Sequence, residues 1–213
     1  MNENTEYYQH SREDLIPFIP ENYGKVLEIG CGEGKFWNLL KPEGIEIWGI
    51  EPNPAAASKA RTRAHKILEG TFEQCLDQLP DAYFDLIICN DVIEHMPDHD
   101  WFFEQIKQKM TPDARLIGSM PNVRYYQTLR SLIFKKDWPY EDAGVLDRTH
   151  LRFFTARSMQ RTFREHDFTI EKFAGVNSPG RFKFFILILN ILLLGTAMDS
   201  KYQQFGFRLS KTN

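Results

Sequence analysis

The order of apolar runs and helical patterns constrains the fold of this chain more than any other feature of its sequence. Short apolar runs occur at 25–30, 45–51, 66–69, 84–90 and 114–120. Helical patterns follow several of them, at 34–40, from Pro54 toward His65, and at 100–110. Strands that alternate with helices are typical of βαβ units, whose strands form a parallel sheet. The strongly apolar run at 84–90 predicts a strand at the centre of that sheet.

The pattern is less regular beyond the fifth run. A helix is expected at 123–135 and a loop at 137–146, and Thr155 is suited to cap a further helix. Two runs with partial alternation, 168–173 and 203–209, predict strands. The fold class that follows is α/β: a doubly wound, mostly parallel sheet with one antiparallel edge strand and helices on both faces.

Composition and charge restrict the classes of function. At 213 residues, with 42% hydrophobic and 26% charged residues, the chain fits one ordinary globular domain. The net charge of −3 supplies no basic stripe, so no nucleic-acid partner is expected. The three cysteines form no Cys-x-x-Cys pair, so neither a disulfide framework nor a structural zinc site is indicated. The acidic beginning is unlike a secretory signal, and with reduced thiols this favours the cytoplasm.

A glycine-rich loop follows the first expected strand. Gly30, Gly32 and Gly34 lie at the carboxyl end of a strand, where doubly wound sheets bind ligands and where glycine lets the backbone approach closely. A dinucleotide fingerprint needs its third glycine at position 35, which is Lys35, so hydride transfer with a nicotinamide cofactor is disfavoured. Glu51 ends the second strand, where a carboxylate can accept hydrogen bonds from both ribose hydroxyls.

These motifs and those that follow them resemble one family. The stretch 26–34 (VLEIGCGEG) is similar to motif I of class I S-adenosylmethionine-dependent methyltransferases, and 49–52 (GIEP) is similar to their second motif. The stretches 84–96 and 116–122 are similar to the family's fourth strand with its loop and to its fifth strand. The resemblance covers nearly the whole chain, and it implies a Rossmann-like fold, methyl transfer, and S-adenosyl-L-methionine as cofactor.

The resemblance also implies roles for individual positions. Gly30 and Gly32 would line the methionine portion of the cofactor, and Glu28 would brace the loop or meet the amine. Glu51 would hold the ribose. Arg12 would meet the cofactor carboxylate as part of an N-terminal lid, because an arginine fork suits that anion.

Further implied contacts surround the adenine and the sulfonium. Residues 52–53 would flank the adenine, 70–72 would close over it, and 90–92 would approach the sulfonium. Thr71 departs from the Asp that the family often has there. The implied cofactor-binding residues are Tyr8, Arg12, Glu28, Gly30, Cys31, Gly32, Gly34, Glu51, Pro52, Asn53, Gly70, Thr71, Phe72, Asn90, Asp91, Val92 and His95.

The acceptor side shows a second resemblance. The stretches 122–126 (NVRYY) and 139–155 are similar to a subgroup of these methyltransferases encoded in bacterial surface-polysaccharide clusters. A sulfonium methyl is already activated, so the enzyme must align the acceptor and remove a proton from a hydroxyl. His95 and His150 are the candidate catalytic bases, since histidine titrates near neutral pH. This chemistry needs no metal, and no metal site is expected.

Candidate substrate-binding residues come from the same region. Arginines there would grip an anionic group on the acceptor, and tyrosines would give a sugar ring a flat apolar face. Surface ion pairing and core packing are the alternatives for these side chains, and a structural hydrogen bond is the alternative for each histidine. The candidates are Asn122, Tyr125, Tyr126, Arg148 and Arg152.

An almost wholly apolar segment lies between Phe184 and Leu194, before the last expected strand. It is shorter than the roughly 18–20 apolar residues that cross a bilayer, so a spanning helix is not expected. Two interpretations stay open: a buried core helix, or a segment that contacts a membrane or a partner. Arg181 and Lys183 would suit anionic headgroups, and such contact would hold a cytoplasmic enzyme at the inner face of the membrane.

The expected organisation is one methyltransferase domain over 1–213, with a lid at 1–22, an acceptor-side insertion at 122–155 and an apolar helical insertion at 181–199. The expected function is O-methylation of a small-molecule acceptor, a sugar or another intermediate of polysaccharide biosynthesis. Two alternatives remain: a lipid-like or isoprenoid-ring acceptor at the membrane surface, and a non-catalytic cofactor-binding protein of the same fold.

Overall fold

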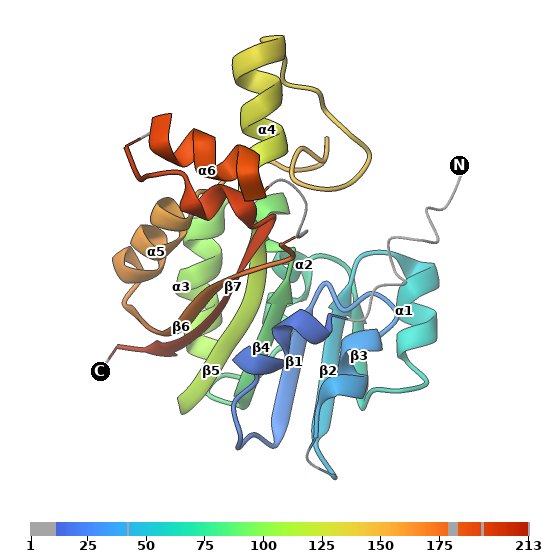
Figure 1. Ribbon diagram of the computed structural model, residues 1–213. Coiled ribbons are helices and arrows are strands. Elements are labelled where there is room, and N and C mark those ends of the chain that lie inside the picture. Colours follow the sequence, from blue (N-terminus) through green and yellow to red (C-terminus); the bar gives the residue numbers. More distant parts are fainter. Residues whose placement is uncertain (1–11, 42, 179–182, 193, 213) are drawn as a thin grey trace.

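The computed structural model describes residues 12–41, 43–178, 183–192 and 194–212. Its centre is one seven-stranded sheet in the order β3-β2-β1-β4-β5-β7-β6 (Figure 1). The strands are β1 (Lys25–Ile29), β2 (Glu46–Glu51), β3 (Lys66–Glu69), β4 (Phe84–Asn90), β5 (Met110–Pro121), β6 (Phe168–Val176) and β7 (Gln204–Lys211). All seven expected strands form. β4 lies between β1 and β5 near the middle of the sheet, as its apolar sequence predicts.

The pairing of the strands explains where a ligand can bind. Strands β1 to β5 pair in parallel, and β7 runs antiparallel to both β5 and β6. The antiparallel pairings therefore gather at the β6 edge, as expected. β2, the next strand along the chain, lies on one side of β1, and β4 lies on the other side of β1. The carboxyl ends of β1, β2 and β4 consequently surround one crevice at this switch point.

Helices connect the strands, and most match their expected positions. They are η2 (Glu13–Phe18), η3 (Lys35–Leu39), α1 (Pro54–Ala60), α2 (Phe72–Cys75), η4 (Leu76–Gln78), η5 (Ile93–His95), α3 (His99–Lys109), α4 (Tyr126–Arg130), η6 (Ser131–Lys135), α5 (Ala156–Glu165), α6 (Lys183–Leu192) and η7 (Met198–Lys201). Thr155 caps α5, as predicted, by accepting from the Ser158 N–H at 3.1 Å. The helix expected at 34–40 is a short 3₁₀ helix, η3, because Gly34 before it is left-handed and Leu40 after it is extended.

Side chains from alternate strand positions build a core on each face of the sheet. Val26 belongs to a cluster that joins the sheet to η2, η3 and α1. Its neighbour Leu27 belongs to a second cluster, which joins the opposite face to α2, α3 and α5. Helices therefore cover both faces, as predicted. Cys31, Cys75 and Cys89 are unpaired and buried in these cores.

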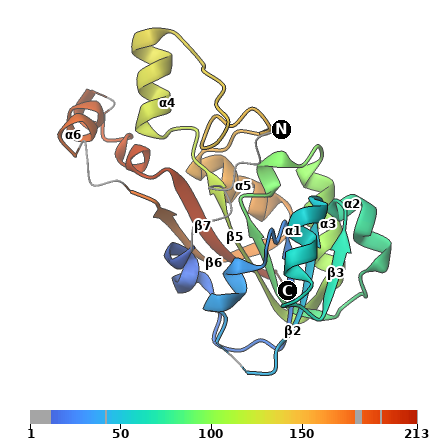
Figure 2. The ribbon, with the colours of Figure 1, turned by 90° about the vertical axis from the view of Figure 1, so that its right-hand side faces the viewer.

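Two helices stand apart from the sheet, beyond the carboxyl end of β5. α4, with η6 continuing it, and α6 project at the same end of the molecule (Figures 1 and 2). A third apolar cluster joins Tyr125 and Tyr126 to Ile186 of α6. Within the described chain, no helix is both long and apolar enough to cross a membrane.

Candidate active site

A cavity of about 1380 Å³ occupies the crevice at the carboxyl ends of β1, β2 and β4. Most of the residues expected to bind the cofactor line it: Arg12, Glu28, Gly30, Cys31, Gly32, Glu51, Pro52, Gly70, Thr71, Phe72, Asn90, Asp91, Val92 and His95. Gly34 and Asn53 are not among the lining residues. Tyr8 lies outside the described residues.

The glycine loop needs glycine at its first position for two reasons. Gly30 has a φ of 68°, in the left-handed region that side chains rarely adopt. A Cβ added at Gly30 would also lie 2.6 Å from Cγ2 of Val92, which follows β4. The loop therefore presents main chain, rather than side chains, to the cavity between β1 and β4.

Glu51 holds this loop in place as well as facing the cavity. Its two carboxylate oxygens accept from the N–H of Gly32 at 2.7 Å and of Asn53 at 2.9 Å. Burial raises the pKa of Glu51, and the two backbone hydrogen bonds oppose that rise. The oxygens keep lone pairs for further donors, because each carboxylate oxygen can accept more than one hydrogen bond.

Two buried polar side chains in the cavity carry atoms without a well-formed hydrogen bond. Oε2 of Glu28 and both amide atoms of Asn90 lack a partner at hydrogen-bond geometry among the described residues. Burial raises the pKa of Glu28 well above its ordinary value, and the nearby Trp37 and Asn90 offset this only in part. Buried polar atoms without partners are costly, so a polar ligand that supplies both donors and an acceptor here would remove that cost.

Arg12 contacts protein carboxylates at the rim of the cavity. Its guanidinium pairs with the Asp91 carboxylate and, at 3.2 Å, with Asp14. Ser119 and Gln204 donate to Oδ1 of Asp91 at 2.8 and 2.9 Å. Asp91 itself adopts a φ of 54°, so this network holds a non-glycine residue in the left-handed region.

Sequence reasoning missed three members of this network, Asp14, Ser119 and Gln204. Gln204 begins β7, 192 positions after Arg12. No local pattern marks a residue whose partner is so distant, because the contact exists only once β7 has paired with β5.

Several expected cofactor residues use their side chains for the fold. Oδ1 of Asn53 caps α1 by accepting from the N–H groups of Ala55 and Ala56. Thr71 forms a capping box with Gln74 at the start of α2, a helix that the sequence did not predict. The buried ring of Phe72 packs against Phe102 at 5.1 Å, so this ring lies in the core.

His95 lies in the wall of the cavity with one ring nitrogen already committed. Its Nδ1 lies 3.2 Å from the carbonyl oxygen of Thr149 and 3.2 Å from the Thr149 hydroxyl. A carbonyl only accepts, so Nδ1 must carry the proton in this contact. In the neutral ring the lone pair is therefore on Nε2, the form that a general base requires.

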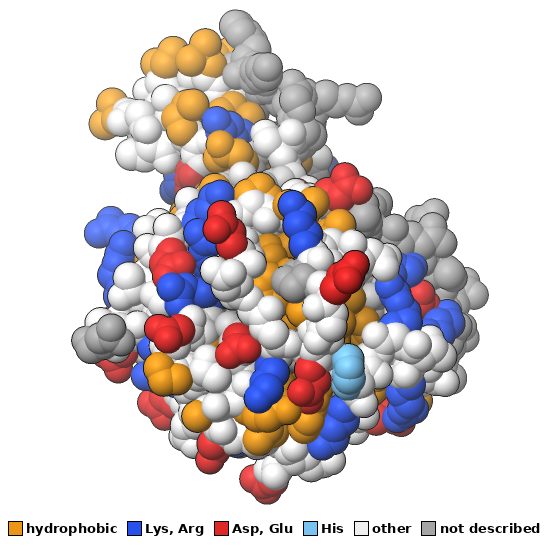
Figure 3. Space-filling view, turned by 90° about the horizontal axis from the view of Figure 1, so that it is seen from below, with side chains coloured by type: hydrophobic (Ala, Val, Ile, Leu, Met, Phe, Trp, Pro, Cys, Tyr) orange, Lys and Arg blue, Asp and Glu red, His pale blue; other side chains and the backbone are white. Residues whose placement is uncertain are grey.

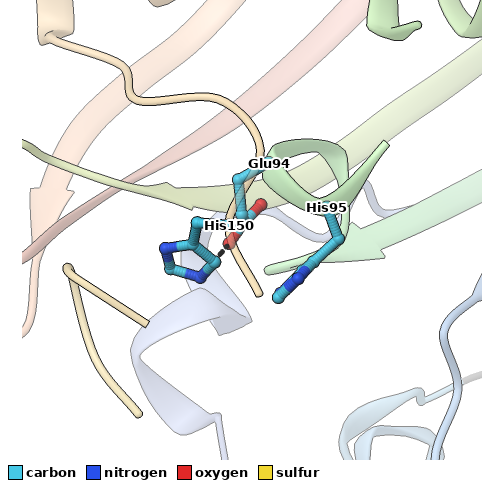
Figure 4. A group of neighbouring side chains, drawn as sticks. All are labelled: Glu94, His95 and His150. Carbon is cyan, nitrogen blue, oxygen red and sulfur yellow. Dashed lines mark ion pairs between the residues drawn. The ribbon is translucent and has the colours of Figure 1, made fainter. Parts of the chain in front are cut away.

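His150, the second candidate base, is buried beside His95 and does not line the cavity. Its Nδ1 lies 3.1 Å from the carbonyl oxygen of Val145, which makes Nδ1 a donor, and its Nε2 lies 3.9 Å from Oε1 of Glu94 (Figure 4). Burial lowers the pKa of His150 and raises that of Glu94 well above its ordinary value. Burial therefore favours the neutral form of both side chains.

Glu94, His95 and His150 also form a group with the spacing of metal ligands. Their ligand atoms lie within 4.8 Å of one another, and the sequence analysis did not expect such a group. A carboxyl group must lose its proton to bind a metal. Burial of Glu94 opposes that loss, and neither of its carboxyl oxygens has a hydrogen-bond partner among the described residues.

Three expected substrate residues lie away from the cavity, so their expected role is corrected. Asn122 is fully buried, and its amide donates to the carbonyl oxygens of Asp199 and Tyr202 at 3.0 Å each. Arg148 pairs with Asp142 at 2.7 Å on the surface. Arg152 donates to the carbonyl oxygen of Pro97 and to that of its neighbour Leu151. Sequence proximity to the expected acceptor loop does not reveal these structural contacts.

Tyr125 and Tyr126 do line the cavity. Their rings meet edge to face at 4.7 Å, and both are buried. Burial and the neighbouring Tyr126 raise the pKa of Tyr125 to about 12. The Tyr125 phenol therefore keeps its proton near neutral pH. The pair also borders a second cavity of about 240 Å³ beside α4.

A family model and several curated proteins are similar to this chain in sequence. The family model described as "Methyltransferase domain" matches residues 2–172. Two curated relatives are named ubiquinone biosynthesis O-methyltransferase. The mitochondrial protein of Schizosaccharomyces pombe is 24% identical over 159 residues, covering 71% of this chain and 57% of the relative. The protein of Photorhabdus laumondii is 27% identical over 150 residues, covering 60% and 62%. The chain therefore spans about three fifths of the length of these relatives.

Solved structures share the fold. A SAM-dependent methyltransferase from Archaeoglobus fulgidus superposes with a TM-score of 0.62 at 22% identity, covering 92% of this chain and 89% of that one. A putative S-adenosylmethionine-dependent methyltransferase from Listeria monocytogenes gives 0.64 at 12% identity, covering 94% and 96%. At these identities the likeness is one of fold, the Rossmann-like methyltransferase fold.

Proposed function

Because this chain belongs to the methyltransferase-domain family and its cofactor is S-adenosylmethionine, we propose that it methylates an oxygen atom of a small-molecule acceptor with His95 as general base. The observation that carries the proposal is the position of His95 in the cavity wall. Thr149 holds its Nδ1 as a donor, and Nε2 keeps the lone pair.

The residues that surround the cavity fit the cofactor. Oε2 of Glu28 and Oδ1 of Asn90 match ligand donors such as an amine, and Nδ2 of Asn90 matches a ligand acceptor. The free lone pairs of Glu51 suit ribose hydroxyls, and Gly30 and Gly32 line the cavity without side chains of their own. We assign Glu28, Asn90, Gly30, Gly32 and Glu51 to holding the cofactor.

The chain's part in the reaction is to orient the acceptor and take its proton. When bound, the cofactor supplies a methyl group already activated by a positive sulfonium. Nε2 of His95 accepts the proton of the acceptor hydroxyl as the oxygen gains the methyl group, which leaves an imidazolium whose Nδ1–H still faces Thr149. The proton then leaves to solvent, and the histidine returns to its neutral form.

Two acceptor classes fit this proposal. The likeness of residues 139–155 to enzymes of polysaccharide clusters supports a sugar or a glycan intermediate. The named O-methylation by the ubiquinone-biosynthesis relatives supports a lipid-like ring acceptor, and the exposed apolar side chains of η6 and α6 favour that class too. A panel of hydroxylated sugars and prenylated phenols, with formation of the demethylated cofactor as readout, separates the two.

The role of His95 is tested by His95→Ala. General-base catalysis contributes about a hundredfold or more, so we expect turnover to fall by at least that factor while calorimetry shows unchanged cofactor affinity. His166→Ala is the matched control, because His166 pairs with Asp100 on the surface. Full activity of His95→Ala contradicts the proposal. Loss of native activity on adding a chelator would instead make Glu94, His95 and His150 a metal site.

A further inference from the structure

Exposed apolar side chains gather where α4 and α6 project from the sheet. We call this set the apical surface, and it comprises two groups of side chains. Leu132, Ile133 and Phe134 belong to η6, and Leu187, Ile188, Ile191 and Leu192 belong to α6. Each of these side chains is between 42% and 71% exposed. In the view from below, hydrophobic side chains also gather on the lobe that projects at the top of the picture (Figure 3).

Packing against the core of the protein does not explain why α6 is so rich in apolar side chains. Of its described side chains, Ile186 and Leu189 are buried against the molecule. The opposite face carries Ile188, Ile191 and Leu192, and on a helix packed only against this core that face would be polar. The interpretation of the segment as a buried core helix is therefore wrong. Exposed apolar side chains gathered in this way mark an interaction site.

Positive charges frame the apolar side chains of η6. Arg130 precedes them and Lys135 and Lys136 follow them, with no acidic residue in between. Within the part of the chain that the structure describes, none of these three cations forms an ion pair with a carboxylate. Apolar side chains flanked by cations are typical of segments that lie in the headgroup region of anionic membranes.

We propose that the apical surface docks on an anionic lipid bilayer, with the apolar side chains of η6 and α6 among the acyl chains and the cations of η6 at the headgroups. Charge complementarity favours this occupant over a second copy of the chain. A two-fold contact would bring the cations of η6 against the cations of the partner copy. A bilayer accommodates both the apolar and the cationic parts.

Residues next to the apical surface line a cavity that borders the active site. Arg130, Ser131 and Lys135 line the second cavity, which shares Tyr125 and Tyr126 with the main cavity. Docking would therefore place the outer wall of this second cavity at the headgroup layer. If the proposed methyl transfer holds, an acceptor carried in the bilayer reaches the site along this cavity.

Vesicle sedimentation tests the docking without relying on activity. The probes are vesicles of pure phosphatidylcholine and of an equal mixture of phosphatidylcholine and phosphatidylglycerol. We expect the native chain to sediment with the anionic vesicles and to be released as salt is raised. The double variant Ile133→Ser/Phe134→Ser should bind these vesicles at least about tenfold more weakly than the native chain, because two apolar anchors are lost. Ile16→Ser is the control, since Ile16 is exposed on η2 and belongs to neither element.

A second variant separates charge from apolar insertion. Lys135→Glu/Lys136→Glu should weaken binding to anionic vesicles by about tenfold or more, because each lysine near such a surface contributes about fivefold. Thermal stabilisation by the demethylated cofactor verifies that each variant is folded, and this readout fails separately if the proposed function is wrong. Native protein that ignores anionic vesicles overturns the docking. So does binding by both double variants that is as tight as that of the native chain, or a native dimer that Ile133→Ser/Phe134→Ser dissociates.

Discussion

The tight contact between Gly30 and Val92 offers a quantitative test of the loop. Gly30→Ala places a Cβ at a backbone φ of 68° and 2.6 Å from Cγ2 of Val92. Gly44→Ala is a matched comparison within the same chain. Gly44 has a φ of 73°, and its added Cβ would meet nothing within 4 Å. The two variants share the backbone strain, and only the first carries the steric contact.

The magnitudes follow from these two terms. A side chain in the left-handed region costs about 1–2 kcal/mol, which is the expected loss of unfolding free energy for Gly44→Ala. Overpacking adds about 1–3 kcal/mol, so Gly30→Ala should lose about 2–5 kcal/mol. Val92→Ala removes the methyl groups that the new Cβ meets. The double variant Gly30→Ala/Val92→Ala should therefore lose less stability than the two single variants together.

Urea unfolding followed by circular dichroism measures each free energy, provided that all variants share one m-value. Calorimetry with the demethylated cofactor reports whether the loop still binds. Equal losses for Gly30→Ala and Gly44→Ala would refute the steric argument. Strict additivity of Gly30→Ala and Val92→Ala would refute it independently.

Other variants test the remaining site residues. Glu51→Ala should weaken cofactor binding by about 1–3 kcal/mol, because it leaves buried donors without an acceptor. Unchanged affinity in calorimetry argues against a role of Glu51 at the ribose. Burial raises the pKa of Glu94 above the unfolded value of about 4.3, so folding takes up a proton and the native chain loses stability as the pH rises above that value. In urea unfolding, the stability of Glu94→Gln relative to that of the native chain should therefore increase from pH 5 to pH 8. A stability difference that does not change with pH contradicts this. His150→Ala should lower stability while leaving turnover far higher than His95→Ala does, and the reverse order in a turnover assay would make His150 the base.

Much of the fold is predictable because its causes are local. The strands follow from apolar runs, the sheet type follows from their alternation with helices, and Thr155 marks the start of α5 by its own side chain. The helices η3 and α2 were harder to predict from the sequence. Gly34 belongs to the loop rather than to a helix, and the capping box of Thr71 with Gln74 decides a helix of one turn.

The site divides in the same way. Gly30, Gly32 and Glu51 lie at or just beyond the carboxyl ends of β1 and β2, so the periodicity of the sequence is enough to bring them together. The tautomer of His95 depends on Thr149, 54 positions later, and the role of Asn122 depends on carbonyl oxygens near β7. Sequence spacing does not predict such hydrogen bonds, because they depend on how distant loops fold back over the sheet.

The sequence by itself determined the positions of the strands along the chain, the glycine loop after β1 and the acid at the end of β2, because hydrophobic period, glycine and chain position act over neighbouring residues. Only the tertiary structure decided which histidine borders the cavity, that Arg12 contacts Asp91, and that α6 turns an apolar face to solvent. Those outcomes depend on which surfaces the folded chain covers. Burial is a property of the whole packed molecule, and no short stretch of residues specifies it.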